Sequence, residues 1–168
     1  NKPWYILRNN FLTFGSPLIE DDEIQEVLDT LKSGWLGTGP KTKLFENKFS
    51  NYIGSKNSIA LNSCTAGLHL ALDSFGIGPG DEVLTTPMTF PATINVIEHV
   101  GAKPVFIDVK KDTFNIDENK IEAAITSNTK AIIPVHLAGR PCEMKIIMSI
   151  SKKYNLKVIE DAAHATES

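Results

Sequence analysis

The chain has 168 residues and a mass of 18.4 kDa, enough for one domain with a sizeable core and too little for two full-sized domains. Its composition, 42% hydrophobic and 22% charged, excludes a disordered tail, a fibrous repeat and a coiled coil. The formal net charge of −3 provides no basic excess for binding nucleic acid or an anionic membrane.

The sequence also indicates where the protein works. No apolar run approaches the length needed to span a bilayer, and the first residues do not form a charged-then-apolar signal peptide. The two cysteines, Cys64 and Cys142, are too few for a disulfide scaffold and fit a reducing compartment. We therefore expect a cytoplasmic protein that binds neither nucleic acid nor membranes.

The N-terminal part of the chain predicts two helices after an irregular segment. Residues 1–19 are expected to be irregular, with a Gly-Ser-Pro break at residues 15–17. Helical spacing of apolar residues covers 21–32, and Gly34 is placed to end this helix in a left-handed cap. A second amphipathic helix is predicted over about 42–53.

Beyond residue 57, short apolar runs alternate with helical stretches. The predicted strands cover residues 58–61, 82–86, 104–108, 131–135 and 157–159. The predicted helices between them cover residues 65–75, 91–99, 118–125 and 143–154. This alternation predicts an α/β fold with a mostly parallel sheet and helices on both faces. Ligands of such sheets bind at the carboxyl ends of the strands, so the loops found there are the candidate site.

The loop after the first predicted strand, residues 62–67, opens a helix with small and hydroxylic side chains. Free N–H groups at the positive end of a helix favour an anion, which predicts a phosphate cradle. The alternative is ordinary capping, because Ser, Thr and Asn cap helices in any case. The loop has neither the P-loop nor the dinucleotide-binding glycine pattern, and no histidine can be assigned as a partner for Cys64.

Two later loops carry an aromatic ring and a carboxylate. Phe90 lies between two prolines, which favours a rigid stacking surface, although an isolated aromatic residue is more often part of a core. Asp161 follows the last predicted strand, where it can hold a protonated ring nitrogen, and His164 can bond an oxygen substituent; solvated capping is the alternative. A metal site that includes His136 is disfavoured because no ligand motif is present.

Together these stretches resemble the sugar aminotransferases of the DegT/DnrJ/EryC1/StrS family, which are fold type I pyridoxal-phosphate enzymes. The likeness covers residues 14–166, with the motifs in the family's order, and is strongest to members that aminate a 4-keto nucleotide sugar, such as the enzyme making UDP-4-amino-4-deoxyarabinose. The resemblance implies that residues 20–168 are the N-terminal part of the large cofactor-binding domain, truncated before its later strands and the small C-terminal domain. The matching stretches are residues 33–40, 62–72, 76–83, 87–93, 101–108, 123–141 and 158–166.

By position, the resemblance assigns contacts with pyridoxal 5'-phosphate to six residues. These are Thr65 and Ala66 at the cofactor phosphate, Phe90 and Ala163 on the two faces of the pyridine ring, Asp161 at the ring nitrogen and His164 near the phenolic oxygen. The carboxylate would keep the ring nitrogen protonated, so that the cofactor can act as an electron sink.

The family's reaction also needs a lysine that forms a Schiff base with the cofactor and moves a proton. In relatives this lysine lies in a Ser-x-x-x-x-Lys motif shortly beyond the Glu-Asp-x-Ala-His motif, and the sequence stops at Ser168 before that point. We therefore assign no catalytic residue and no metal ligand, and expect the chain to be incomplete for catalysis. The resemblance further implies that residues 58–61 lack their neighbours, because two later strands lie between them and the rest of the sheet.

For the complete enzyme, the resemblance implies transfer of an amino group from glutamate to the keto group of a nucleotide-linked sugar, in polysaccharide or amino-sugar biosynthesis, by a homodimer. Two alternatives stay open. One is a non-catalytic, truncated family member, and the other is a pyridoxal-phosphate sugar dehydratase with histidine in place of the lysine. A nucleotide-binding oxidoreductase fits less well, because its glycine fingerprint is absent.

Overall fold

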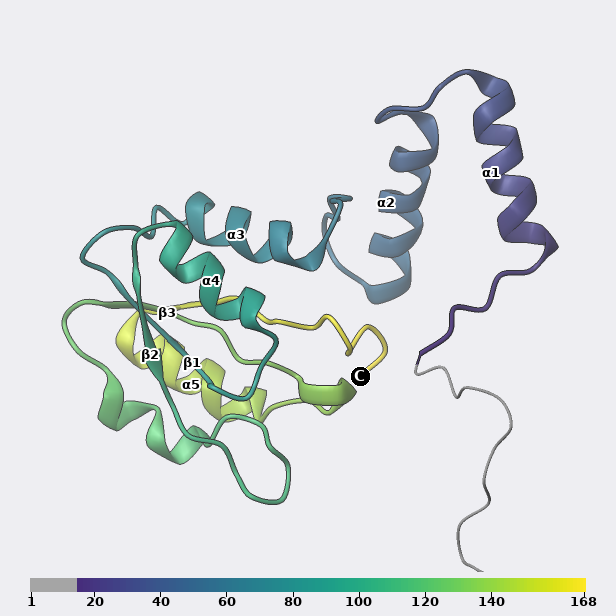
Figure 1. The fold of residues 1–168 in the computed structure, drawn as a ribbon. Helices are drawn as coiled ribbons and strands as arrows, with labels where there is room; N and C mark the ends of the chain where they lie inside the picture. Colours follow the sequence, from purple (N-terminus) through teal and green to yellow (C-terminus); the bar gives the residue numbers. More distant parts are fainter. Residues whose placement is uncertain (1–14) are drawn as a thin grey trace, which may run out of the picture. The chain divides into compact units, whose positions relative to one another are not determined.

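The computed structural model describes residues 15–168 (Figure 1). The irregular segment predicted for residues 1–19 therefore lies largely outside the described residues. The described chain divides into two compact units, with the boundary between Phe45 and Glu46. Within the described part, no helix is both long enough and apolar enough to cross a membrane.

The first helix, α1 (Asp21–Ser33), has the ends that its sequence predicts. At its start, the Glu20 N–H donates to the Glu23 carboxylate at 2.7 Å, and acidic residues fill the first turn. At its end, Gly34 adopts a left-handed conformation with φ 72° and donates its N–H to the Leu31 carbonyl. Helix α2 (Pro40–Ile53) follows after a short loop.

The second unit is built on a four-stranded parallel sheet with the order β2-β1-β3-β4. Its strands are β1 (Glu82–Thr85), β2 (Lys103–Phe106), β3 (Thr129–Ile132) and β4 (Lys157–Val158). The helices around it are α3 (Cys64–Ser74), α4 (Pro91–His99) and α5 (Met144–Tyr154). This arrangement confirms the predicted α/β class (Figure 1).

The core lies on both faces of this sheet, because successive strand residues point to opposite sides. On one face, Val83 packs in a buried cluster with Leu72 of α3 and Ile97 of α4. On the other face, Leu84 packs in a second cluster with Ile147 of α5. Helices therefore cover both faces, as the alternating pattern predicts.

The strand predicted for residues 58–61 is wrong for this structure, since these residues form no ladder. Their polar groups bond to side chains instead: the Ala60 N–H donates to Glu46 Oε1 at 3.0 Å, and Ser58 Oγ accepts from Ser50 Oγ at 2.9 Å. Ile59 remains 77% exposed. An extended segment becomes a strand only beside another strand, and none is available here.

The helix predicted for residues 118–125 is also wrong. Two single 3₁₀ turns, Glu118–Lys120 and Glu122–Ala124, replace it. Ile121 lies between the turns and is fully buried in the cluster that contains Leu84. The apolar spacing in the sequence therefore predicts correctly which residue is buried. The backbone N–H groups of the segment, however, form i→i+3 hydrogen bonds and not those of an α-helix.

Candidate functional site

A cavity of about 290 Å³ opens where the strands of the second unit end. Its size is close to the lower end of small-molecule pockets, which is about 300 Å³. Its walls come from the N-terminal end of α3 and from the loops that follow β1, β3 and β4. The lining residues are Cys64, Thr65, Leu68, Thr89, Phe90, Ala92, Val135, His136, Leu137, Asp161, Ala163 and His164.

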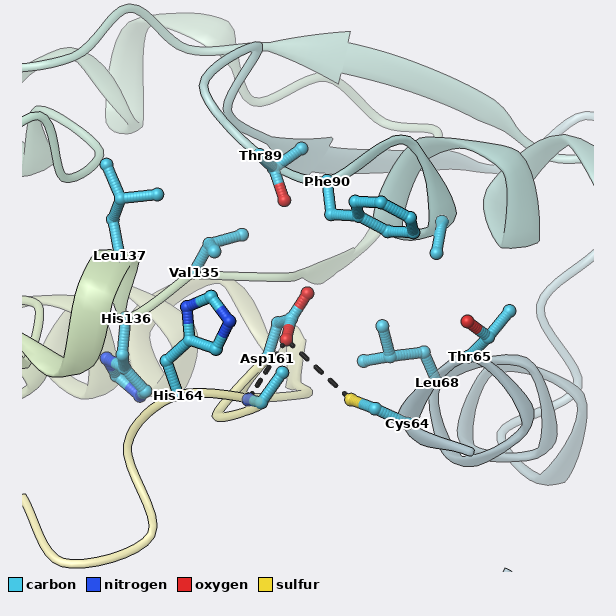
Figure 2. Close-up of a pocket in the computed structure, with 12 residues that line it drawn as sticks. Cys64, Thr65, Leu68, Thr89, Phe90, Val135, His136, Leu137, Asp161 and His164 are labelled. Atoms are coloured by element: carbon cyan, nitrogen blue, oxygen red, sulfur yellow. Dashed lines mark hydrogen bonds between the residues drawn. The ribbon is translucent and has the colours of Figure 1, made fainter. Parts of the chain in front are cut away.

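Five of the six predicted cofactor residues line this one cavity (Figure 2). They come from three separate segments: Thr65 on α3, Phe90 before α4, and Asp161, Ala163 and His164 after β4. The sixth, Ala66, is not part of the lining.

Asp161 is the single acidic residue among the described residues that line the cavity, and 7% of its surface is exposed. Thr93 Oγ1 donates to Asp161 Oδ2 at 2.7 Å, and the Ala163 N–H donates to Oδ1 at 3.3 Å. The Cys64 thiol lies 3.8 Å from the same Oδ1 (Figure 2). No lysine, arginine or histidine of the described chain forms an ion pair with Asp161. A buried carboxylate is costly without a positive partner, so the cavity suits a ligand that carries a cationic or N–H group.

The backbone of Asp161 is fixed by the sheet. Its N–H donates to the Pro134 carbonyl at 2.9 Å, and its carbonyl accepts from the His136 N–H at 3.1 Å. These bonds form a parallel bridge between Val135 and Asp161 beyond the end of β4. The carboxylate is therefore positioned by strand pairing rather than by a free loop.

The N-terminal end of α3 offers two unused amides. The Ser63 hydroxyl caps the helix by accepting from the Ala66 N–H at 3.2 Å, and the Gly67 N–H donates to the Ser63 carbonyl. Within the described chain, the N–H groups of Cys64 and Thr65 have no acceptor. An anion at the positive end of this helix would satisfy both, so Thr65 fits a phosphate better than Ala66 does.

Phe90 is presented to the cavity rather than buried in the core, since 76% of it is exposed. It precedes Pro91, the first residue of α4, and its extended backbone is locked there by the proline. Its ring stands at the cavity edge across from Leu68 and the Asp161 carboxylate (Figure 2). The alternative that Phe90 belongs to the core is therefore excluded.

The comparisons with known proteins agree with this geometry. Residues 17–168 match the sequence pattern of the DegT/DnrJ/EryC1/StrS aminotransferase family. The chain belongs to this family. It is an aminotransferase family that uses pyridoxal phosphate, and its solved relatives include sugar aminotransferases.

Three relatives illustrate the likeness. An uncharacterized protein of Methanocaldococcus jannaschii is 60% identical over 95% of this chain and 42% of its own length. The spore coat polysaccharide biosynthesis protein SpsC of Bacillus subtilis is 54% identical over 94% of this chain and 41% of its own. Spr1654 of Streptococcus pneumoniae, assigned as a sugar aminotransferase and solved in pyridoxal-phosphate and pyridoxamine-phosphate forms, is 43% identical with a TM-score of 0.87, over 92% of this chain and 43% of its own. The chain thus spans less than half the length of these three relatives.

The cavity fits the cofactor of the DegT/DnrJ/EryC1/StrS family. Pyridoxal phosphate has an anionic phosphate, a flat ring and a ring nitrogen that can carry a proton. The cavity offers free amides at α3, the exposed Phe90 ring, and the buried Asp161 carboxylate without an ion-pair partner. Each feature of the cofactor therefore has a matching group in this chain.

His136 is a buried residue of the cavity wall, and both of its ring nitrogens form hydrogen bonds. It is buried, and its Nδ1 accepts from the Cys142 N–H at 3.0 Å. Nε2 therefore carries the proton of the neutral ring and donates to Glu160 Oε2 at 2.9 Å. Among the described residues, no three histidine, cysteine or acidic side chains gather as a metal site.

Both cysteine thiols have raised pKa values, and desolvation is the first cause of each shift. Burial raises the pKa of the Cys64 thiol, and the nearby negative charge of Asp161 raises it further. Burial raises the pKa of the Cys142 thiol to about 11. A raised pKa lowers the fraction of thiolate at a given pH, and the thiolate is the reactive form of cysteine.

Thr93 was not predicted as a site residue, although it makes the shortest bond to Asp161. One signal was present in the sequence. Thr89 and Thr93 are four residues apart across the start of a helix, a spacing that brings their hydroxyls together, here at 2.8 Å.

Proposed function

We propose that this chain supplies the cofactor site of a pyridoxal-phosphate-dependent sugar aminotransferase. The observation that carries the proposal is the buried Asp161 carboxylate, which has no ion pair among the described residues and shares its cavity with the free amides of α3. This combination is matched to a ligand with a phosphate at one end and a protonated nitrogen at the other.

At the phosphate end, Thr65 contributes its free N–H and its hydroxyl. The neighbouring Cys64 N–H is a second donor, and the positive end of α3 adds a favourable field. Ala66 contributes through Ser63: its N–H holds the capping hydroxyl, which keeps the first turn of the helix in shape.

At the ring end, Phe90 stacks on one face of the pyridine ring and Ala163 contacts the other. Asp161 bonds the ring nitrogen and holds its proton there, while His164 lies near the phenolic oxygen. When bound, the cofactor carries the amino group between donor and acceptor and withdraws electrons from the reacting carbon. This chain's part is to bind the cofactor, orient its ring and keep the nitrogen charged.

For the substrates, we propose glutamate as the amino donor and a 4-keto sugar carried on a nucleotide as the acceptor, as for the enzyme that makes UDP-4-amino-4-deoxyarabinose. The likeness to a spore coat polysaccharide biosynthesis protein supports a sugar product that is used in a surface polysaccharide. We further propose that the complete protein acts as a homodimer in the cytoplasm.

The test is a titration of the complete protein with pyridoxal phosphate, followed by visible absorbance. Asp161→Asn should weaken cofactor binding by about 10-fold or more, because it removes a charged partner of the ring nitrogen. Asp108→Asn is the matched control, since Asp108 is an exposed aspartate paired with Lys120 and lies outside the cavity. Added glutamate should convert the wild-type cofactor to its amine form. Equal affinities for the two variants, or no binding by the wild type, would refute the proposal.

A further inference from the structure

The proposed function leaves two hydroxyl groups near Asp161 without a role. One bonds the Asp161 carboxylate, and the second bonds the first. Thr93 Oγ1 lies 2.7 Å from Asp161 Oδ2, and Thr89 Oγ1 lies 2.8 Å from Thr93 Oγ1. Thr93 is fully buried in α4, whereas Thr89 is half-buried in the cavity wall. We call these two residues the hydroxyl chain; it runs from the cavity wall through the interior to the carboxylate.

Only one arrangement of donors and acceptors is possible in the hydroxyl chain. A carboxylate has only acceptor atoms, so Thr93 must donate its single proton to Asp161. With that proton used, Thr93 can only accept from Thr89, which therefore directs its own proton inward. The Thr89 oxygen, which faces the cavity in Figure 2, is left with acceptor lone pairs alone.

Thr93 is also the strongest of the three donors to Asp161. Its 2.7 Å bond is in the range of hydroxyl bonds to a charged carboxylate. The other donors both bond Oδ1 and are longer, at 3.3 Å for the Ala163 N–H and 3.8 Å for the Cys64 thiol. In the described chain Thr93 alone bonds Oδ2, so its removal frees that half of the carboxylate.

We propose that Thr93 is a positioning residue for the Asp161 carboxylate, and that Thr89 supports it by donating to the Thr93 oxygen. The proposal rests on the proposed role of Asp161 at the ring nitrogen. The hydroxyl chain holds Oδ2 in place and stabilises its negative charge before a ligand enters, so the carboxylate needs no reorganisation on binding. Thr93 itself is fully buried and is not one of the residues that line the cavity, so it acts through Asp161.

The test compares Thr93→Val with Thr93→Ser in the complete protein. Valine keeps the shape of threonine without the hydroxyl, and serine keeps the hydroxyl without the methyl group. We expect pyridoxal-phosphate affinity to fall by about 10-fold in Thr93→Val, as for loss of a bond to a charged group, and to stay within about 2-fold of wild type in Thr93→Ser. The visible spectrum of the bound cofactor, which reports the charge of its ring, should change in the first variant and return in the second.

Thr85→Val is the matched control. Thr85 is equally buried, but its hydroxyl donates to the Ile133 carbonyl at 3.0 Å and lies outside the cavity lining. This variant should bind the cofactor as wild type does. If Thr93→Val yields no folded protein, Thr89→Val takes its place, with an expected weakening of about 3-fold that Thr89→Ser restores.

The outcomes separate the two proposals. The role of the hydroxyl chain is overturned if Thr93→Val binds pyridoxal phosphate as tightly as Thr85→Val does. It is also overturned if Thr93→Ser binds the cofactor as weakly as Thr93→Val does. If Asp161→Asn binds as wild type does, the proposed function itself fails. A loss in Asp161→Asn and Thr93→Val, with rescue in Thr93→Ser, supports both.

Discussion

Replacing Gly139 by alanine tests whether the loop after β3 holds the cavity in shape. Gly139 has φ +85°, and a Cβ atom at this position would lie 2.9 Å from the His164 carbonyl oxygen. Ordinary contacts begin at 3.4 Å, so the backbone of His164 must retreat by about 0.5 Å. That displacement moves one wall of the cavity.

Gly80→Ala is the matched control for this change. Gly80 has φ +90°, close to that of Gly139, but nothing lies within 4 Å of the place that an alanine Cβ would take there. Alanine in the left-handed region costs about 1 kcal/mol at either position. The difference between the two variants therefore isolates the contact with His164.

We expect both variants to lose about 1 kcal/mol of unfolding free energy in urea, and Gly139→Ala to lose somewhat more. Only Gly139→Ala should weaken pyridoxal-phosphate binding, by about 10-fold, because a displacement of this size disturbs a preorganised site. Absorbance titration of the complete protein measures this affinity. Wild-type affinity in Gly139→Ala, or an equal loss in Gly80→Ala, would refute the reasoning.

Two further predictions concern the core and the thiol beside the carboxylate. Leu72→Ala should lower the free energy of unfolding by about 2–5 kcal/mol, because Leu72 is fully buried. Leu70→Ala on the same helix should lower it little, since Leu70 is 52% exposed. Urea unfolding of the two variants measures the difference. Asp161→Asn should lower the raised pKa of Cys64 by removing a negative charge, and so speed its alkylation by iodoacetamide at a fixed pH near 8. Mass spectrometry of the labelled peptides measures this, with Cys142 as the site whose rate should not change.

Local sequence signals predicted five of the six expected helices, and only the helix at residues 118–125 is wrong. The predicted helix at residues 91–99 has the bounds of the observed α4 (Pro91–His99), because Pro91 starts it and apolar spacing continues it. Gly34 ends α1 in the expected left-handed cap. These features depend on neighbours within a few residues, which the sequence displays directly.

Features that depend on distant partners were not predictable in the same way. Residues 58–61 have the composition of a strand, but a ladder is not a property of one segment. Only the family resemblance, and not the local pattern, indicated that their neighbours are missing. The role of Thr93 was missed because its partner, Asp161, lies 68 residues away. The proposal that the phosphate binds the Thr65 N–H and not the Ala66 N–H depends on which N–H donates to the Ser63 hydroxyl. The sequence does not show that this donor is Ala66.

The site and the sheet are built from the same bonds, which explains why the candidate residues converge. Asp161 is set by its bridge to Val135, and the flanking Glu160 is tied to His136, whose other ring nitrogen accepts from the loop at Cys142. The cavity wall therefore continues the pairing of β3 with β4. A change that weakens this pairing should alter cofactor affinity together with stability. Loss of the Thr93 hydroxyl should alter both as well, because it leaves Oδ2 of the buried Asp161 without its donor. Rescue by serine, rather than unchanged stability, therefore identifies the part that the hydroxyl plays.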